Sequence, residues 1–343
     1  MIKKSIYGKI TLAFVGALII PTFAVAQIKM GIILGFTGPI ESLTPDMGKS
    51  AELAFKEVSD SGQLLGGQKV SVVRGDSTCI DAAAATAAAE RLITSDKVAG
   101  IMGADCSGVT TAIANNVAVP NGVAMISPSA TSPALSTIAD NGYFFRTAPS
   151  DARQGQVLAE ITIERGINEV AVTYTNNDYG KGLSDSFINA YQGLGGKVSA
   201  VVPHEDGKAD YSAEVATLDA SGADVLAVFG YVDQGGRHTI QTSIDSGSFD
   251  KFILADGMYG ESLLKNIDGD LSGTFGTVPG TDSKGSETFK GMAQSAGITV
   301  GGPFTGESYD AAALLMLAMQ SAGSTDRAAI ASNVFAVANA PGV

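Results

Sequence analysis

The sequence predicts an α/β protein with two lobes, each built on a mainly parallel sheet that helices flank. Short apolar segments alternate with longer segments of helical periodicity, which is the pattern of repeated βαβ units. Several of the apolar segments carry no polar residue, as expected of parallel strands that are covered on both faces. The alternation runs through twice, with a break near 147–151, and it therefore predicts two similar lobes joined by a hinge.

The first run of segments predicts a complete doubly wound sheet. Its expected strands are 28–34, 70–73, 98–102, 123–126 and 143–146. Its expected helices are 47–58, 82–93 and 109–117. The first of these helices has an apolar face, which indicates packing against a sheet and consists of Met47, Ala51, Leu53, Ala54 and Phe55.

The second run repeats the pattern and then returns. Its expected strands are 170–174, 198–202, 225–229 and 252–255, and its expected helices are 151–164, 182–195, 212–220 and 235–246. Residues 272–278 form an extended segment suited to crossing back to the first lobe, and a helix is expected over 309–322. We therefore assign 27–147 and 279–343 to the N-terminal lobe, and 148–278 to the C-terminal lobe.

Residues 1–26 predict a cleavable signal peptide. Lys3, Lys4 and Lys9 precede an apolar run over 10–20, and a small-x-small site at Ala24 to Ala26 follows. The apolar run is short for a membrane span, although an N-terminal anchor helix remains the alternative. The mature protein is thus expected in the bacterial periplasm, without insertion into the membrane.

Charge and cysteine content narrow the function further. The formal charge is −13, and loss of the three N-terminal lysines makes it −16, so a nucleic-acid partner is not expected. Two cysteines in an exported chain most simply form one disulfide, although two buried free thiols remain possible. Only two histidines accompany them, at no ligand spacing, and no metal site is expected.

The sequence lacks the usual signatures of enzymes and cofactor sites. The triplet Gly48 to Ser50 suggests a phosphate loop, but Leu43 stands where that motif requires glycine. No Gly-x-Gly-x-x-Gly follows the first strand, and no Gly-x-Ser-x-Gly is present. His204 and His238 have no partners in a triad pattern and are expected at the surface. We therefore expect no cofactor and no enzymatic activity, with catalysis in the cleft as the weaker alternative.

Polar residues at the ends of two first-lobe strands suggest a socket for a small anionic group. Ser107 follows the third strand, and Ser129, Ala130 and Thr131 follow the fourth. The carboxyl ends of parallel strands are where open α/β sheets bind ligands, and free backbone N–H groups at helix starts favour a carboxylate. The alternative is that these hydroxyls only cap helices.

The second lobe offers complementary groups at its own strand ends. Tyr179 and Tyr231 follow two of its strands, and Asp256 follows a third. Asp256 is suited to neutralising an ammonium group, and its alternative roles are to cap the helix that begins near Glu261 or to serve as an ordinary turn residue. Together the two lobes predict a cleft for a small zwitterion.

The chain resembles the leucine/isoleucine/valine-binding proteins of ABC transporters, which are type I periplasmic binding proteins. The resemblance runs from Ile28 to about Ala340 and rests on a set of motifs rather than on any single one. These are the motifs GFTGP at 35–39, CS at 106–107, MISPSATSP at 125–133, FRT at 145–147, DYGKG at 178–182 and YDA at 309–311.

The resemblance implies a role for each candidate residue. It pairs Cys79 with Cys106, and it assigns the ligand α-carboxylate and part of the ammonium to Ser107, Ser129 and Thr131. It places Tyr179 and Tyr231 where the second lobe closes over the ligand, and Asp256 where the family has an acidic residue for the ammonium. Departures from the family are Leu43 or Thr44 in place of an aromatic residue, Asp256 in place of glutamate, and no terminal crossover strand and hairpin after Val343.

The function implied is capture of a branched-chain or related amino acid by hinge closure and delivery to the permease subunits of an ABC importer. A monomer is expected. The main alternative is a ligand-sensing domain for amino acids or amides that feeds a chemoreceptor or a regulator. Amides, urea derivatives and aromatic acids are other ligand classes within the broad group.

Overall fold

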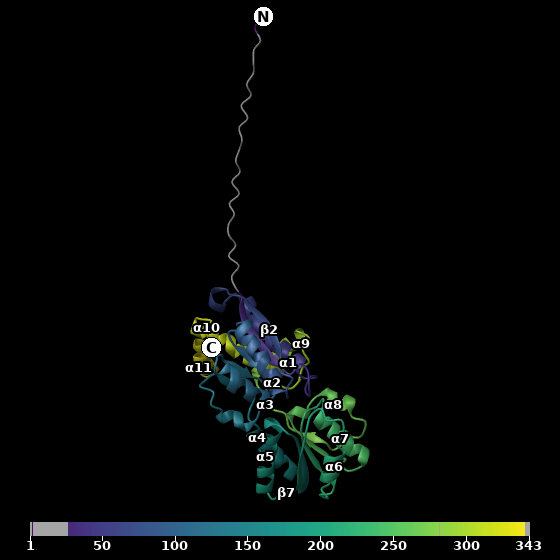
Figure 1. The fold of residues 1–343 in the computed structure, drawn as a ribbon. Helices are drawn as coiled ribbons and strands as arrows, with labels where there is room; N and C mark the ends of the chain where they lie inside the picture. Colours follow the sequence, from purple (N-terminus) through teal and green to yellow (C-terminus); the bar gives the residue numbers. More distant parts are fainter. Residues whose placement is uncertain (1, 3–26, 281, 340–343) are drawn as a thin grey trace.

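The computed structural model describes residues 2, 27–280 and 282–339, and the predicted signal peptide lies outside this part of the chain. Two five-stranded sheets form the centres of two lobes, which lie one above the other in Figure 1. All the strand pairings described are parallel. The predicted α/β fold with two parallel sheets is therefore confirmed.

The first sheet has the order β2-β1-β3-β4-β5. Its strands are β1 (Ile28–Leu34), β2 (Val70–Asp76), β3 (Ile101–Gly103), β4 (Met125–Ser127) and β5 (Phe144–Arg146). The helices between them are α1 (Thr44–Ser61), α2 (Ala82–Glu90) and α3 (Ser107–Ile113), with short helical segments at Leu64–Gly66, Arg91–Ser95, Ala114–Ala118 and Pro133–Thr137. The strand order reverses beside β1, so the loops after β1 and β3 lie together at the carboxyl edge.

The second sheet has the order β10-β9-β8-β6-β7. Its strands are β6 (Glu169–Thr175), β7 (Lys197–His204), β8 (Leu226–Phe229), β9 (Phe252–Leu254) and β10 (Phe275–Gly276). Its helices are α4 (Asp151–Glu164), α5 (Asp178–Gly193), α6 (Ser212–Asp219), α7 (Gly235–Ser246) and α8 (Glu261–Asn266), and one 3-10 turn spans Asp256–Met258.

The last helices return to the first lobe. They are α9 (Lys284–Ser295), α10 (Thr305–Ala322) and α11 (Arg327–Ala338). Ala311, Leu315 and Met319 of α10 are buried in the same apolar cluster as Met30 and Ile32 of β1. In Figure 1 the yellow α10 and α11 accordingly lie beside the purple start of the chain. The exact lobe boundaries at 147 and 279 stay predictions.

Four helices begin earlier than predicted, namely α1, α3, α5 and α10. Helix α5 starts at Asp178 rather than at 182, because the Asn177 side chain accepts the backbone N–H groups of Tyr179 and Gly180. Helix α1 starts at Thr44 rather than at 47, with Pro45 in its first turn, where the missing N–H costs nothing. Tyr179 therefore lies on the first turn of a helix and not in a loop.

The expected exposure of His204 is wrong. Its side chain is 1% exposed, at the end of β7, and its Nδ1 lies 2.8 Å from the Thr173 hydroxyl. Gly230 makes room for it, because a Cβ there would lie 2.9 Å from the His204 Nε2. Burial lowers the pKa of His204 to about 4, so the ring is neutral at physiological pH.

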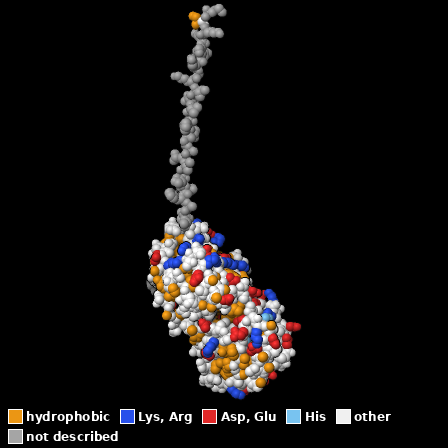
Figure 2. All heavy atoms as spheres, in the orientation of Figure 1, with side chains coloured by type: hydrophobic (Ala, Val, Ile, Leu, Met, Phe, Trp, Pro, Cys, Tyr) orange, Lys and Arg blue, Asp and Glu red, His pale blue; other side chains and the backbone are white. Residues whose placement is uncertain are grey.

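Acidic side chains are spread over both lobes on the face shown in Figure 2, in keeping with the negative formal charge. Within 27–280 and 282–339, no helix has the length together with the apolar character that crossing a bilayer demands. The same part of the chain shows no group of three or more His, Cys, Asp or Glu side chains arranged to hold a metal ion.

Candidate ligand-binding cleft

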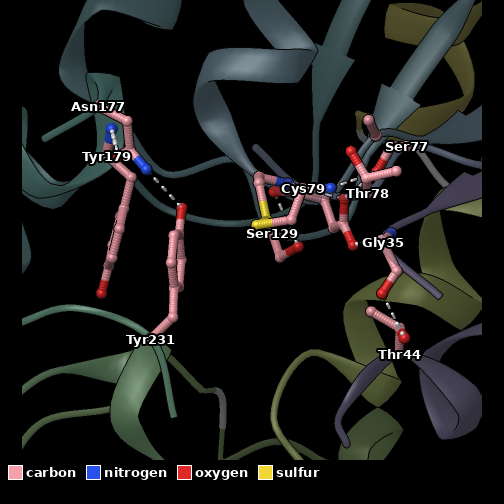
Figure 3. Close-up of a disulfide and its surroundings, with 12 residues drawn as sticks. Gly35, Thr44, Ser77, Thr78, Cys79, Ser129, Asn177, Tyr179 and Tyr231 are labelled. Carbon is pink, nitrogen blue, oxygen red and sulfur yellow. Dashed lines mark hydrogen bonds between the residues drawn. A yellow bond between two sulfur atoms is a disulfide. The ribbon is translucent and has the colours of Figure 1, made fainter. Parts of the chain in front are cut away.

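A disulfide fixes the first-lobe side of the cleft. Cys79 follows β2, Cys106 precedes α3, and the two are joined with a Cα–Cα distance of 5.2 Å. The predicted disulfide is thus present. Figure 3 shows it beside Ser129, with Tyr179 and Tyr231 on the opposite side of the view. The bond joins the loops that follow β2 and β3, the two strands on either side of β1, next to the candidate carboxylate socket.

Asp105 joins three loops of the same region through hydrogen bonds to its buried carboxylate. Its carboxylate accepts the backbone N–H of Gly35 at 2.6 Å, that of Cys106 at 2.9 Å and the hydroxyl of Ser77 at 3.1 Å. The side chain is 1% exposed, and burial raises the pKa of Asp105 against these hydrogen bonds. Its oxygens are already used to join the loops after β1, β2 and β3, so we assign it a structural role.

The predicted first-lobe residues lie together, but some of their polar groups are already hydrogen-bonded within the protein and are not free to bind a ligand. The Ser129 hydroxyl donates to the Asp105 carbonyl at 3.2 Å, and the Ala130 N–H donates to the Ser127 hydroxyl at 2.9 Å. The Ser107 oxygen accepts the Ser132 N–H at 3.1 Å, which leaves its own proton to donate.

Thr131 is the first-lobe residue with an unused polar group. Its side chain is 0% exposed, and among the described residues its hydroxyl has no hydrogen-bond partner. Buried polar groups are normally hydrogen-bonded, and a buried group without a partner requires an explanation. Ser107 and Thr131 are therefore the first-lobe side chains best placed to meet a ligand.

Two tyrosines line the second-lobe side. Tyr179 and Tyr231 are 3% and 4% exposed, and their rings stack with centroids 5.3 Å apart. Asn177 donates to the Tyr231 hydroxyl at 3.4 Å, as the dashed line in Figure 3 marks. The stack makes a rigid, mostly apolar wall with hydroxyl groups at its rim.

Asp256 is held by the first of these tyrosines. The Tyr179 hydroxyl donates to Asp256 Oδ1 at 3.1 Å and accepts the Gly257 N–H at 3.1 Å. Asp256 begins the 3-10 turn and does not cap α8, whose N-cap residue is Gly260. The alternative role as a cap for α8 is therefore wrong, and a buried carboxylate remains at the carboxyl end of β9.

Asp151 is a site residue that the sequence analysis missed. It is the first residue of α4, it is 0% exposed, and its N–H donates to the Thr131 carbonyl at 2.9 Å. Both of its carboxylate oxygens are buried without a hydrogen-bond partner among the described residues. The sequence presented Asp151 as an ordinary first-turn residue after the cap Ser150, and no spacing pointed to the cleft.

The two carboxylates make the cleft strongly favourable for a cation. Burial, and then the charge of Asp256, raise the pKa of Asp151 well above its usual value, while the Thr131 side chain and then the charge of Arg146 oppose the rise. Burial raises the pKa of Asp256 to about 6. Arg146 donates to the carbonyls of Ala130 and Ser132 at 3.1 and 2.8 Å. The Arg146 charge thus acts on Asp151, but these hydrogen bonds of Arg146 run to carbonyls and not to either carboxylate.

The candidate site residues form a cluster around Asp151, Asp256 and Thr131, and a groove of about 880 Å³ lies beside it, between the two lobes. Its lining includes Leu43 and Val300 from the first lobe, and Met258, Tyr259 and Leu264 from the second. Of the predicted ligand-binding residues, none lines this groove. The Thr44 hydroxyl is bonded to the Gly35 carbonyl at 2.9 Å, so Leu43 rather than Thr44 is available on the first-lobe side.

The lobes touch across the cluster. The Pro133 side chain lies against Gly182 of α5, where a Cβ would be 2.8 Å from Pro133 Cδ. Cys106 and Ala130 of the first lobe also share a buried apolar cluster with Tyr179 and Tyr231 of the second. The cleft is thus closed, and its polar residues are shielded from solvent.

The sequence matches the periplasmic binding protein family over residues 27–338, on which the fold and the cleft both lie. The chain belongs to this family. A relative at 30% identity is the Leu/Ile/Val-binding protein homolog 1 of Brucella abortus, over 94% of this chain and 86% of that protein. The resemblance to the leucine/isoleucine/valine-binding proteins is therefore confirmed.

Solved structures of other binding proteins show the same architecture. The leucine-binding protein LivK of Thermotoga maritima is 26% identical, with a TM-score of 0.79 over 90% of this chain and 87% of that one. The substrate-binding protein LivJ of Streptococcus pneumoniae, in complex with isoleucine, is 24% identical, with a TM-score of 0.78 over 91% and 88%. The type I fold of this binding protein is thereby established.

Proposed function

We propose that the protein captures an amino acid in the closed cleft and presents it to the permease of an ABC importer. The observation that carries the proposal is the buried pair Asp151 and Asp256, with the buried Thr131 hydroxyl beside Asp151. A zwitterion enters such a site only if both of its charged ends are hydrogen-bonded. The cluster supplies partners for both ends.

The ammonium end is assigned to the two carboxylates. Asp256 has one oxygen bonded to Tyr179, and Asp151 has both oxygens unused. An ammonium group has three donors and needs acceptors in three directions. The two carboxylates and the Thr131 oxygen provide them, and the ligand charge is opposite to that of the carboxylates.

The carboxylate end is assigned to the first lobe. The Ser107 hydroxyl keeps a proton to donate, and the start of α3 directs backbone N–H groups toward the same space. Tyr231 and Tyr179 cover the ligand from the second lobe. The side chain of the ligand would then extend toward Leu43 and Met258, whose apolar surface favours an aliphatic group.

Closure completes the binding cycle. Asp256 and the tyrosines follow strands of the second sheet, whereas Ser107 and Thr131 follow strands of the first, so a ligand gains the second set only when the lobes close. The free energy of these additional contacts is what favours the closed form. Residues 1–26 would direct export to the periplasm, where a monomer would meet the permease.

Ligand analogues test the assignment of both charged ends. We would measure thermal shift and calorimetric affinity with leucine, with 4-methylpentanoate, which lacks the amino group, and with 3-methylbutylamine, which lacks the carboxylate. Leucine or a related amino acid should bind at least about a hundredfold more tightly than either analogue, since each loses a charged partner. Benzoate binding as tight as that of any amino acid, or no amino-acid binding at all, would contradict the proposal.

A further inference from the structure

Two hydrogen bonds to aspartate carboxylates join the lobes outside the residues assigned to the ligand. The backbone N–H of Ser42 donates to Asp233 Oδ2 at 2.8 Å, and the Thr111 hydroxyl donates to Asp178 Oδ2 at 3.0 Å. Ser42 and Thr111 belong to the first lobe, and the two aspartates follow strands of the second sheet. Both bonds require the lobes to be closed.

Asp233 is the more fully engaged of the two aspartates. Its N–H donates to the Pro39 carbonyl at 3.0 Å, and its Oδ1 accepts the Ser262 hydroxyl at 2.6 Å. Ser262 lies on α8 of the same lobe, so this second bond orients the carboxylate before the lobes meet. An ionised acceptor already held in place makes a stronger hydrogen bond than a neutral, mobile one.

Residues 39–43, which are hydrogen-bonded to Asp233 through Pro39 and Ser42, also pack on the second lobe. Leu43, directly after Ser42, is partly buried against the apolar cluster that contains Met258 and Leu263. Gly260 leaves room for it, because a Cβ at Gly260 would lie 3.0 Å from Leu43 Cδ2. Residues 39–43 thus contact the second lobe through two backbone groups and one apolar side chain.

We propose that Asp233 and the backbone groups of Pro39 and Ser42 form a clasp that sets how strongly the lobes close, whatever ligand lies between them. The proposal rests on the proposed function, in which closure completes the ligand site. A contact that forms only in the closed state, and does not touch the ligand, changes the closed population by a fixed factor. The clasp therefore scales the affinities for all ligands equally and leaves their order unchanged.

The Thr111–Asp178 bond is a second, weaker part of the same device. It joins α3 to the first turn of α5, next to the cleft, and Asp178 is exposed. The Thr111 hydroxyl has one proton to donate, and the Ser107 carbonyl competes for it at 2.9 Å, so we expect a smaller effect from this bond than from Asp233.

The test compares Asp233→Ala with the matched control Ser262→Ala, which removes the hydroxyl from Asp233 Oδ1 and leaves the Ser42 bond in place. Calorimetry with leucine, isoleucine and valine should show Asp233→Ala weakening each by about tenfold with unchanged ratios, and Ser262→Ala by about twofold or less. Thr111→Val, an isosteric change, should weaken all three by about threefold. It serves as the second variant if Asp233→Ala does not fold.

Small-angle X-ray scattering of the ligand-free proteins gives a readout that needs no ligand. Asp233→Ala should have a larger radius of gyration than the parent, because loss of the clasp lowers the closed fraction of the ligand-free protein. Unequal losses among the three ligands, or unchanged affinities together with unchanged scattering, would overturn the clasp. If the parent binds none of the amino acids, the proposed function fails, and equal scattering of the variant and the parent then overturns the clasp separately.

Discussion

The Tyr179 hydroxyl lies 3.1 Å from the Asp256 carboxylate and 3.1 Å from the Gly257 amide, so one side chain links a helix start to a strand end. This arrangement holds Asp256 in the buried cleft in a fixed direction. Gly257 is required for it, because a Cβ there would lie 2.6 Å from the Gly230 carbonyl oxygen and 2.9 Å from the Tyr179 hydroxyl.

Gly257→Ala should therefore weaken amino-acid binding by at least about tenfold, which corresponds to about 1.4 kcal/mol. The added methyl group forces the Tyr179 ring away from Asp256. The control is Gly291→Ala, on α9, where no atom lies within 4 Å of the new Cβ. Calorimetry with the best ligand of the panel measures both, and equal losses in the two variants would contradict the role given to Tyr179.

Asp151→Asn should make the ligand-free protein more stable and weaken its binding of amino acids. Removing one of two buried carboxylates relieves the repulsion between them, so the free energy of unfolding of the ligand-free protein should rise at pH 7. Amino-acid affinity should fall by at least about tenfold, because an acceptor for the ammonium loses its charge. Urea unfolding and calorimetry measure the two effects.

The control for this change is Asp219→Asn, at the exposed end of α6. It should alter the unfolding free energy by no more than about 0.5 kcal/mol and leave affinity unchanged. A variant at Asp151 that is less stable and binds normally would show that the carboxylate serves the fold and not the ligand.

The affinity of the protein should fall as the pH drops below about 6. Burial raises the pKa of Asp256 to about 6, and a protonated Asp256 no longer attracts an ammonium group. From pH 7.5 to pH 5 we expect a loss of about tenfold, one proton being taken up per unbound site. Asp256→Asn should bind weakly and should lack this pH dependence.

The raised pKa of Asp256 has the opposite pH effect on the stability of the ligand-free protein. Because the folded-state pKa of Asp256 is raised, the native state binds more protons between about pH 4 and pH 6, and this group makes stability fall as pH rises through that window. An affinity that stays flat between pH 7.5 and pH 5 in the parent would show that Asp256 does not contact the ammonium.

His204 should destabilise the fold in acid. Its folded-state pKa of about 4 lies below the value of 6.5 in the unfolded chain, so stability is lost as pH falls from 6.5 toward 4. The full effect is roughly 3 kcal/mol. The unfolding free energy of His204→Gln relative to the parent should therefore rise over that range, and a constant difference would contradict the neutral, buried ring.

The sequence was sufficient to predict the alternation of strands and helices, both parallel sheets and the return of the chain to the first lobe. These features follow from apolar periodicity, which tertiary contacts reinforce. It was also sufficient to place Ser107, Thr131 and Asp256 at strand ends, because the carboxyl edge of a parallel sheet follows from topology alone.

Asp151 and His204 could not be predicted in the same way. Asp151 looks like a favourable first-turn acid of α4, and only the packing of Thr131 and Asp256 around it shows that it is buried. His204 ends an edge strand, where a polar residue is usually exposed, and its burial depends on two distant glycines, Gly230 and Gly235. Burial of a single polar side chain is a property of neighbours that are remote in the sequence.

A structure of the protein with leucine, or with whichever amino acid of the panel binds, tests the central claim most directly. The account predicts the ligand nitrogen within hydrogen-bond distance of Asp256 and Asp151, and the ligand carboxylate at Ser107 and the start of α3. A ligand seated instead in the groove lined by Leu43 and Tyr259, with both aspartates out of reach, would contradict it.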